Sequence, residues 1–211
     1  MHFEPIAIVG RACLLPGANN PQQLWQAIVD KQNLVSRVPA GRWGLSAKSA
    51  LKDPALGGNA EDAAWSDKGG YVEGFEKVFN PEGFAIAAEE ITKLDPLVQW
   101  VLHTGREALR DAGLKGSAKT GAIFGNLSFP TSGLSRFAER VWMGEKQATL
   151  AGVPASDPSN RFMSGLPAHL LAQALELGGG AYCLDAACAS SLYAIKLACH
   201  ELQDGKADVM L

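Results

Sequence analysis

The sequence predicts an α/β fold built on a parallel or mostly parallel sheet with helices on both faces. Short apolar runs rich in β-branched residues and bounded by glycine recur along the chain, as is typical of buried strands. Segments with helical periodicity and clear start signals lie between them. Because strands alternate with helices of useful length, the helices are expected to serve as crossovers between parallel strands.

The predicted strands are short and lie far apart in the sequence. Ile6–Val9 is uninterrupted, β-branched and followed by Gly10, which predicts a buried strand. The other predicted strands are Ala122–Phe124 between two glycines, Ala181–Ala187, and Ala207–Leu211.

Two helices have strong start signals in which a capping residue precedes proline. Asn20-Pro21 predicts a helix that runs to about Lys31. Asp95-Pro96 predicts a second helix, which Gly113 ends in the position after the last turn.

Three further helices follow from apolar periodicity, over residues 133–143, 160–176 and 190–203. On the last one we expect an apolar stripe of Leu192, Ile195, Cys199 and Leu202. Residues 44–70 are rich in Gly, Ala, Ser and Asp and have weak periodicity, which predicts a long surface excursion within one domain. Tyr71–Phe75 is a further candidate strand.

Composition excludes several classes of protein. With 211 residues, 47% hydrophobic and 19% charged, the chain can form a real core and is not a disordered or collagen-like sequence. A net charge of −3 without blocks of like charge gives no electrostatic support for a nucleic-acid or anionic-membrane partner. No apolar run approaches the ~18–20 residues that a membrane span needs.

The first residues and the cysteines indicate a cytoplasmic protein. An early Glu4 and Pro5 without a basic region do not fit a secretory signal. Four cysteines without a CxxC pair are too few for a disulfide scaffold and argue against structural zinc. We therefore expect reduced cysteines in a cytoplasmic setting.

The segment from Tyr182 to Leu192 carries the clearest chemistry. An apolar strand runs into small residues, Cys188, more small residues and then an amphipathic helix, which is the pattern of a nucleophile elbow. At a helix start, the unpaired N–H groups and the positive end of the dipole stabilise a thiolate. The same N–H groups can bind the oxyanion that forms on a thioester carbonyl during acyl transfer.

A structural interpretation of the cysteines stands beside this one. Free cysteine is among the most buried residue types, so Cys188 could equally be a small packing residue on spacing alone. The other three cysteines favour packing: Cys13 ends a predicted strand, Cys183 lies within one, and Cys199 is on the apolar stripe of a helix.

The run Asp185–Leu192, DAACASSL, closely resembles the active-site signature of β-ketoacyl synthases, usually written DTACSSSL. Other segments resemble the same family in order along essentially the whole chain. These are the opening strand at Pro5–Gly10, LPGA at 15–18, Asn20-Pro21, LDP at 94–96, EALRDAG at 107–113 and Ser159–Arg161. The details are most similar to the ketosynthases of polyunsaturated fatty acid synthases and related iterative type I polyketide synthases.

This resemblance implies a thiolase-like α/β/α/β/α fold made of two similar halves. It implies that Cys188 is the nucleophile, which takes an acyl chain as a thioester from the phosphopantetheine arm of an acyl carrier protein. A malonyl-type extender is then decarboxylated and condensed with that chain. The resemblance implies no cofactor in this domain, and a homodimer joined through the strand 181–187. Phe129 and Phe162 are candidate lining residues of the substrate pocket, although phenylalanine is more often a core residue.

The family carries its two catalytic histidines on motifs that follow the cysteine. After Cys188 the sequence holds only His200, on the next helix, where neither family histidine occurs. His103 and His169 fall within other predicted helices, and His2 is near the start. We therefore expect residues 1–211 to be the N-terminal half of a ketosynthase, without its C-terminal half, and unable to condense acyl groups alone.

Two alternatives remain open. A non-catalytic partner of the same fold, similar to a chain-length factor, would also lack the histidines, although such members lack the cysteine too. A cysteine hydrolase with an elbow nucleophile would need a downstream histidine and would leave the N-terminal motifs unexplained.

Overall fold

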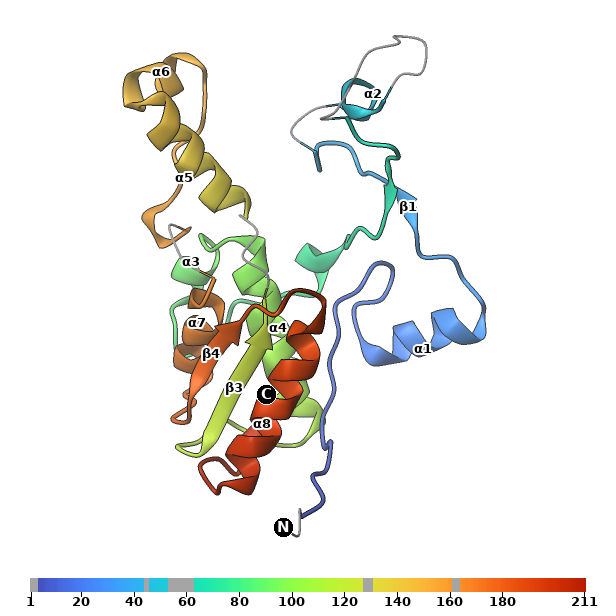
Figure 1. Cartoon of the computed structure of the whole chain (residues 1–211), viewed down its shortest axis with the longest axis vertical. Helices are drawn as coiled ribbons and strands as arrows, with labels where there is room; N and C mark the ends of the chain where they lie inside the picture. Colours follow the sequence, from blue (N-terminus) through green and yellow to red (C-terminus); the bar gives the residue numbers. More distant parts are fainter. Residues whose placement is uncertain (1–3, 44–45, 53–62, 127–130, 161–163) are drawn as a thin grey trace. The chain divides into compact units, whose positions relative to one another are not determined.

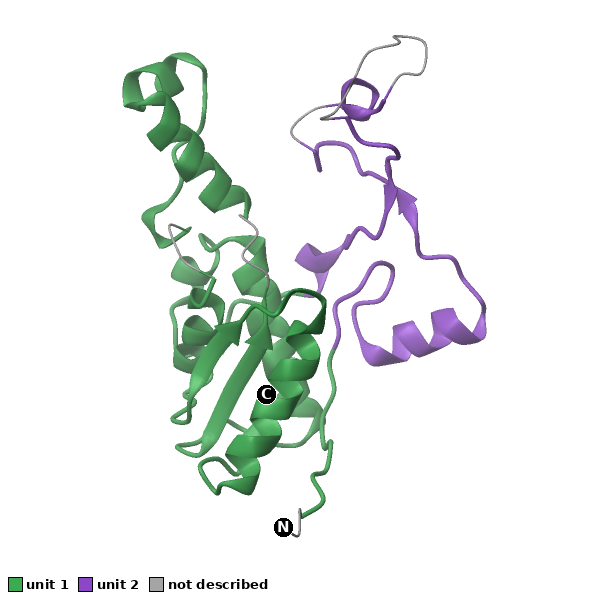
Figure 2. Ribbon diagram, in the orientation of Figure 1, with its two compact units in different colours: residues 1–12, 79–211 green, residues 13–78 purple. Residues whose placement is uncertain are grey.

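The computed structural model describes residues 4–43, 46–52, 63–126, 131–160 and 164–211. The chain forms two compact units, one of residues 1–12 with 79–211 and one of residues 13–78 (Figure 2).

The larger unit is built on a three-stranded parallel sheet. Its order is β4-β3-β5, with β3 (Thr120–Gly125) between β4 (Ala181–Leu184) and β5 (Val209–Met210). Ala122 is paired with Ala181 on one side, and Thr120 with Val209 on the other. The α/β class with a parallel sheet is therefore confirmed.

Helices cover both faces of this sheet (Figure 1). α8 (Ser190–Gln203) lies in front of β3 in that view, while α7 (Leu166–Ala174) and α4 (Pro96–Asp111) lie behind it. Side chains alternate along a strand, so Ala122 and Phe124 face the α4 and α7 side, where both belong to the core or pack against it. Ile123 and Gly125 face α8.

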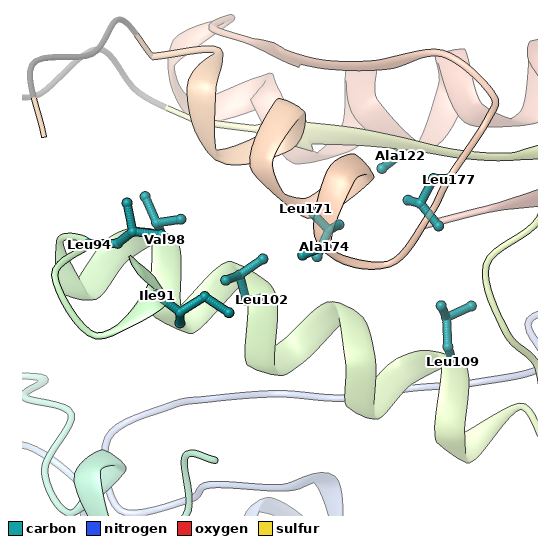
Figure 3. Packing of buried hydrophobic residues seen from close by; sticks show 9 residues of the cluster. All are labelled: Ile91, Leu94, Val98, Leu102, Leu109, Ala122, Leu171, Ala174 and Leu177. Atoms are coloured by element: carbon teal, nitrogen blue, oxygen red, sulfur yellow. The ribbon is translucent and has the colours of Figure 1, made fainter. Parts of the chain in front are cut away.

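The main core lies between α4, α7 and β3, as Figure 3 shows from close by. Val98, Leu102 and Leu109 recur along one face of α4 and are almost fully buried. Gly105 lets α7 come close, because a Cβ there would lie 2.6 Å from Cδ1 of Leu171. The cluster consists of Ile91, Leu94, Val98, Leu102, Leu109, Ala122, Leu171, Ala174 and Leu177.

A buried polar pair ties three distant segments to this core. Asp95 caps α4 by accepting a hydrogen bond from the Leu97 N–H, and its second oxygen accepts one from the Gly133 N–H, at 3.0 Å each. Asn160 accepts from the Asp95 N–H at 2.6 Å and donates to the Lys93 carbonyl at 2.9 Å. The capping role of Asp95 is as predicted, and the link to Gly133 adds a tertiary function.

Further helices complete the larger unit. They are α3 (Ala88–Ile91), α5 (Ser132–Met143), α6 (Glu145–Leu150) and the 3-10 turn η3 (Pro158–Asn160). α5 and α6 pack together, and Arg140 holds them by pairing with Glu145 and donating to the Val153 carbonyl at 2.6 Å.

The smaller unit has little regular structure (Figure 2). It holds α1 (Pro21–Val29), β1 (Ser36–Arg37), α2 (Ala47–Ala50), β2 (Lys68–Gly69) and the 3-10 turn η2 (Phe75–Lys77). β1 and β2 pair antiparallel, and Arg37 forms an ion pair with Asp67 at 2.9 Å. Asn20 caps α1 with Pro21 in the first turn, as predicted.

Several predicted elements differ in the structure. Ile6–Val9 forms no strand and is largely exposed, and its backbone is not paired with any of the described strands. Tyr71–Phe75 is also not a strand. The predicted strand 181–187 ends at Leu184, the strand 207–211 shortens to Val209–Met210, and the helix predicted from 160 begins at Leu166.

Candidate active site

Cys188 lies in the turn between a strand and a helix, as the elbow pattern predicts. β4 ends at Leu184, the 3-10 turn η4 covers Ala187–Ala189, and α8 begins at Ser190. Cys188 is in the middle of η4 and is exposed, whereas the other three cysteines are half-buried. The only cysteine open to a bulky reagent in the described structure is thus the one that precedes α8.

The turn contains a backbone conformation that L-residues seldom adopt. Ala187 has φ of 49°, in the left-handed region, which costs a non-glycine residue about 1–2 kcal/mol. Short side chains permit the turn, and local hydrogen bonds hold it. The Asp185 carboxylate accepts from the Ala187 N–H at 2.9 Å, and the Ala186 carbonyl accepts from the Ala189 N–H at 3.1 Å.

The first turn of α8 lies directly against the end of β3. A Cβ at Gly125 would stand 2.7 Å from the Ser190 carbonyl carbon and 2.8 Å from the Ser191 nitrogen. Such contacts are too short for any other residue, so glycine at 125 sets how closely α8 approaches the sheet. The buried residues of α8 are correspondingly small, Ser190 and Ala194.

This corrects the predicted apolar stripe of α8. Leu192 and Ile195 are 69% and 62% exposed, so they do not face the sheet. The face of α8 that packs on β3 carries small residues. Gly125 lets α8 approach the sheet closely, and the narrow space between them does not accommodate long side chains.

The turn that contains Cys188 also lies at the carboxyl ends of the parallel strands, where α/β proteins usually bind their ligands. β3 and β4 end side by side, since the Asn126 N–H donates to the Leu184 carbonyl at 3.0 Å. Asn126 also donates through Nδ2 to the Ser164 carbonyl at 2.8 Å. Ligands of open α/β sheets bind beyond the carboxyl ends of the strands. Cys188 therefore lies where the fold offers a binding position, at the positive end of a 14-residue helix.

Comparison with known proteins identifies the family. The family profile described as "Beta-ketoacyl synthase, N-terminal domain" matches residues 3–211. The chain belongs to the β-ketoacyl synthase family. The resemblance deduced from the DAACASSL run is therefore confirmed.

Curated relatives of the chain are polyketide synthases, which agrees with this family. Over 98% of its length the chain is 36% identical to the mycocerosic acid synthase-like polyketide synthase of Mycolicibacterium smegmatis, of which it covers 9%. It is 34% identical over 99% of its length to the mycoketide-CoA synthase of Mycobacterium tuberculosis, of which it covers 5%. It thus spans less than a tenth of the length of these β-ketoacyl synthase relatives.

Among solved structures, the "PfaC Keto synthase-Chain length factor" matches with a TM-score of 0.85 and 33% identity, over 97% of this chain and 23% of that one. The oxazolomycin ketosynthase domain OzmH KS7 of Streptomyces albus matches with a TM-score of 0.69 and 26% identity, over 94% and 33%. These ketosynthase neighbours confirm the predicted thiolase-like class of fold.

Of the other cysteines of this β-ketoacyl synthase domain, Cys183 lies in β4 as predicted, whereas Cys13 follows a segment that is not a strand. Burial raises the pKa of the Cys13 and Cys183 thiols, which favours their neutral form. His103 is buried in α4, His169 is exposed on α7, and His200 is in the last turn of α8. Phe129, Phe162 and His2 lie outside the described residues.

Two further observations concern the described part of the chain. There, no three His, Cys, Asp or Glu side chains come together as metal ligands would. Within the same residues, every helix is too short or too polar to cross a bilayer.

Sequence reasoning missed two residues of the site, Ser190 and Gly125. Ser190 stands in the recognised signature, but its buried hydroxyl becomes visible only in three dimensions. Gly125 closes a short apolar run, which marked it as the end of a strand. Nothing local in the sequence indicates that α8 packs against it.

Proposed function

We propose that this chain is the loading half of a condensing enzyme of the 3-oxoacyl-[acyl-carrier-protein] synthase type, with Cys188 as the nucleophile. The observation that carries the proposal is the exposed Cys188 in the turn before α8, at the carboxyl edge of a parallel sheet. The relatives named above are polyketide synthases, which supports fatty acid or polyketide chains as the acyl class.

In the proposed loading step, the Cys188 thiolate attacks the carbonyl carbon of an acyl thioester on the phosphopantetheine arm of an acyl carrier protein. A new bond forms between the cysteine sulfur and the acyl carbon. The bond between that carbon and the carrier sulfur breaks, and the carrier leaves as a thiolate that takes up the proton lost by the Cys188 thiol. Backbone N–H groups at the start of α8, that of Cys188 included, stabilise the oxyanion of the intermediate.

Condensation needs groups beyond this site. A malonyl-type extender must lose carbon dioxide, and the resulting enolate must be stabilised while it attacks the acyl group on Cys188. By resemblance to the family, this step uses two histidines on motifs C-terminal to the cysteine, and none of the four histidines of this chain matches them. We therefore propose that the chain loads acyl groups but does not join them.

Partners and location follow from the same proposal. The acyl carrier protein is the partner that delivers the chain, and no resident cofactor is required. β4 forms one edge of the described sheet, which supports the homodimer through residues 181–187. Cytoplasmic localisation and a kinship to the synthases of polyunsaturated fatty acids belong to this proposal as well.

The test is acyl loading measured by intact-protein mass spectrometry. The chain is incubated with an acyl carrier protein that bears a labelled acyl thioester, and the expected product carries one acyl group on Cys188. Cys188→Ala should abolish loading, whereas the matched control Cys199→Ala should load as wild type. Acyl transfer that survives Cys188→Ala would contradict the proposal.

The chain-length-factor alternative has one observation in its favour, the name of the solved neighbour that joins a ketosynthase to a chain length factor. Cys188 argues against it, because factors of that kind lack the cysteine by family resemblance. Absence of loading in a folded chain would favour this alternative. Carbon–carbon bond formation by the 211 residues alone would show that the histidines are dispensable and would refute the loading-only role.

A further inference from the structure

We infer that Ser190 is a positioning residue that holds Cys188 in its reactive place. This inference rests on the proposed function, because it assigns a role relative to the proposed nucleophile. Ser190 is 7% exposed, although serine is usually a surface residue.

The Ser190 hydroxyl braces the backbone on the strand side of Cys188. Its oxygen accepts a hydrogen bond from the Ala186 N–H at 2.9 Å and donates its own proton to the Ala187 carbonyl at 2.7 Å. One side chain at the start of α8 thereby fixes two consecutive residues of the incoming turn. Cys188 lies inside the loop that these bonds close.

One of the two braced residues is the strained one. Ala187 holds φ of 49° at a cost that its own side chain does not offset. Such a conformation persists only where the surroundings hold it, and the bond from the Ser190 hydroxyl to the Ala187 carbonyl is a direct restraint. Without that bond, Ala187 can relax toward an ordinary φ, and Cys188 next to it moves.

Ser190 is itself fixed from the opposite side. Its Cβ lies 2.9 Å from where a Cβ at Gly125 would stand, so its backbone packs directly on the end of β3. The Ser190 hydroxyl therefore connects the tightly packed junction of α8 with the sheet to the strained backbone of Ala187.

Ser191 offers a matched contrast one residue along. It has the same side chain but is exposed on α8. If loss of any serine hydroxyl from the first turn of α8 slowed acyl loading, both positions would show the same effect. If the hydrogen bonds of the Ser190 hydroxyl position Cys188, only the change at Ser190 should slow loading.

The experiment compares acyl loading by the wild-type chain, Ser190→Ala and Ser191→Ala. We expect Ser190→Ala to lower kcat of loading about 10- to 100-fold, as misplacement of a reacting group by about 1 Å does. KM for the acyl carrier thioester should stay within about twofold. Ser191→Ala should leave both constants within about twofold of wild type.

Ser190→Thr keeps the hydroxyl and should restore most of the loading rate. If Ser190→Ala fails to fold by circular dichroism, this variant decides the question: near wild-type loading supports the brace, and a tenfold loss in a folded protein overturns it. Equal kinetics of Ser190→Ala and Ser191→Ala also overturn it. Loading that survives Cys188→Ala would instead refute the proposed function, so the two failures are distinguishable.

Discussion

The two faces of β3 are covered in opposite ways. On one face, Ala122 and Phe124 meet the long aliphatic side chains of α4 and α7. On the other, Gly125 meets Ser190, and the buried residues of α8 are small. The first face buries much apolar surface, and the second brings backbones close together.

The difference between the two faces suggests that one stabilises the fold and the other positions Cys188. Burial of apolar area dominates the favourable free energy of folding, so the α4 and α7 face should supply most of the stability. Close backbone contact fixes geometry to a fraction of an ångström, since packed interiors deform little. The α8 face should therefore govern the chemistry of Cys188 more than the stability of the fold.

The largest expected effect on stability comes from Leu102→Ala, in the centre of α4. Leu102 is fully buried, and removing its side chain leaves a cavity that costs about 2–5 kcal/mol of the free energy of unfolding. Chemical denaturation measures this loss. Leu192→Ala, the same change at a 69% exposed position of α8, should cost no more than about 0.5 kcal/mol. Equal losses would show that the two faces do not differ as described.

Gly125→Ala should have a smaller effect on stability and a larger one on the site. The added methyl meets backbone atoms at 2.7 and 2.8 Å, which cannot rotate away, so α8 must shift at a cost of about 1–3 kcal/mol. Alkylation of Cys188 by iodoacetamide should change markedly, while in Leu102→Ala it should not.

Gly180→Ala is the control for that variant, because nothing lies within 4 Å of a Cβ there. An unchanged alkylation rate in a folded Gly125→Ala variant would mean that the approach of α8 does not set the position of Cys188.

The smallest expected effect is a dependence of stability on pH through His103, on the α4 side. Burial lowers the pKa of His103 below its ordinary 6.5, and Arg106 and Arg110 act in the same direction, whereas Glu107 opposes them. As the pH falls below 6.5, the imidazole of His103 therefore binds a proton more readily in the unfolded chain than in the folded chain. The free energy of unfolding should fall as pH drops from 6.5, and this contribution should be absent above it.

Denaturation at several pH values between 7.5 and 5.5 tests this for wild type and His103→Gln. The variant should show a shallower slope below pH 6.5. The control is His169→Gln, which removes an exposed imidazole from α7. A slope unchanged by His103→Gln would refute the assignment.

Local signals predicted much of the fold. The pairs Asp95-Pro96 and Asn20-Pro21 predicted helix starts, and helices begin there in the structure. These signals are reliable because capping depends on neighbouring residues only. The helix over 190–203 has the predicted bounds. Ile6–Val9 was predicted wrongly, since a strand depends on a partner that periodicity does not reveal.

The position of the candidate nucleophile was predictable from the sequence, whereas the residues packed around it were not. Cys188 stood out because small residues surround a cysteine between a strand and a helix. The apolar pattern of α8 predicted the wrong buried face, because Ser190 and Ala194, which are buried, are not strongly hydrophobic. Their burial depends on Gly125, which is remote in sequence, and only the pairing of β3 with β4 brings the two together.

The order of strands in the sheet has a consequence during synthesis on the ribosome. β3 lies in the middle, yet both of its partners, β4 and β5, come later in the chain. At about 5–20 residues per second, the interval between translation of Gly125 and Ala181 is roughly 3–11 s. During this time the apolar faces of β3 and α4 lack α7 and β4, so the nascent chain passes through an aggregation-prone stage that a chaperone can recognise.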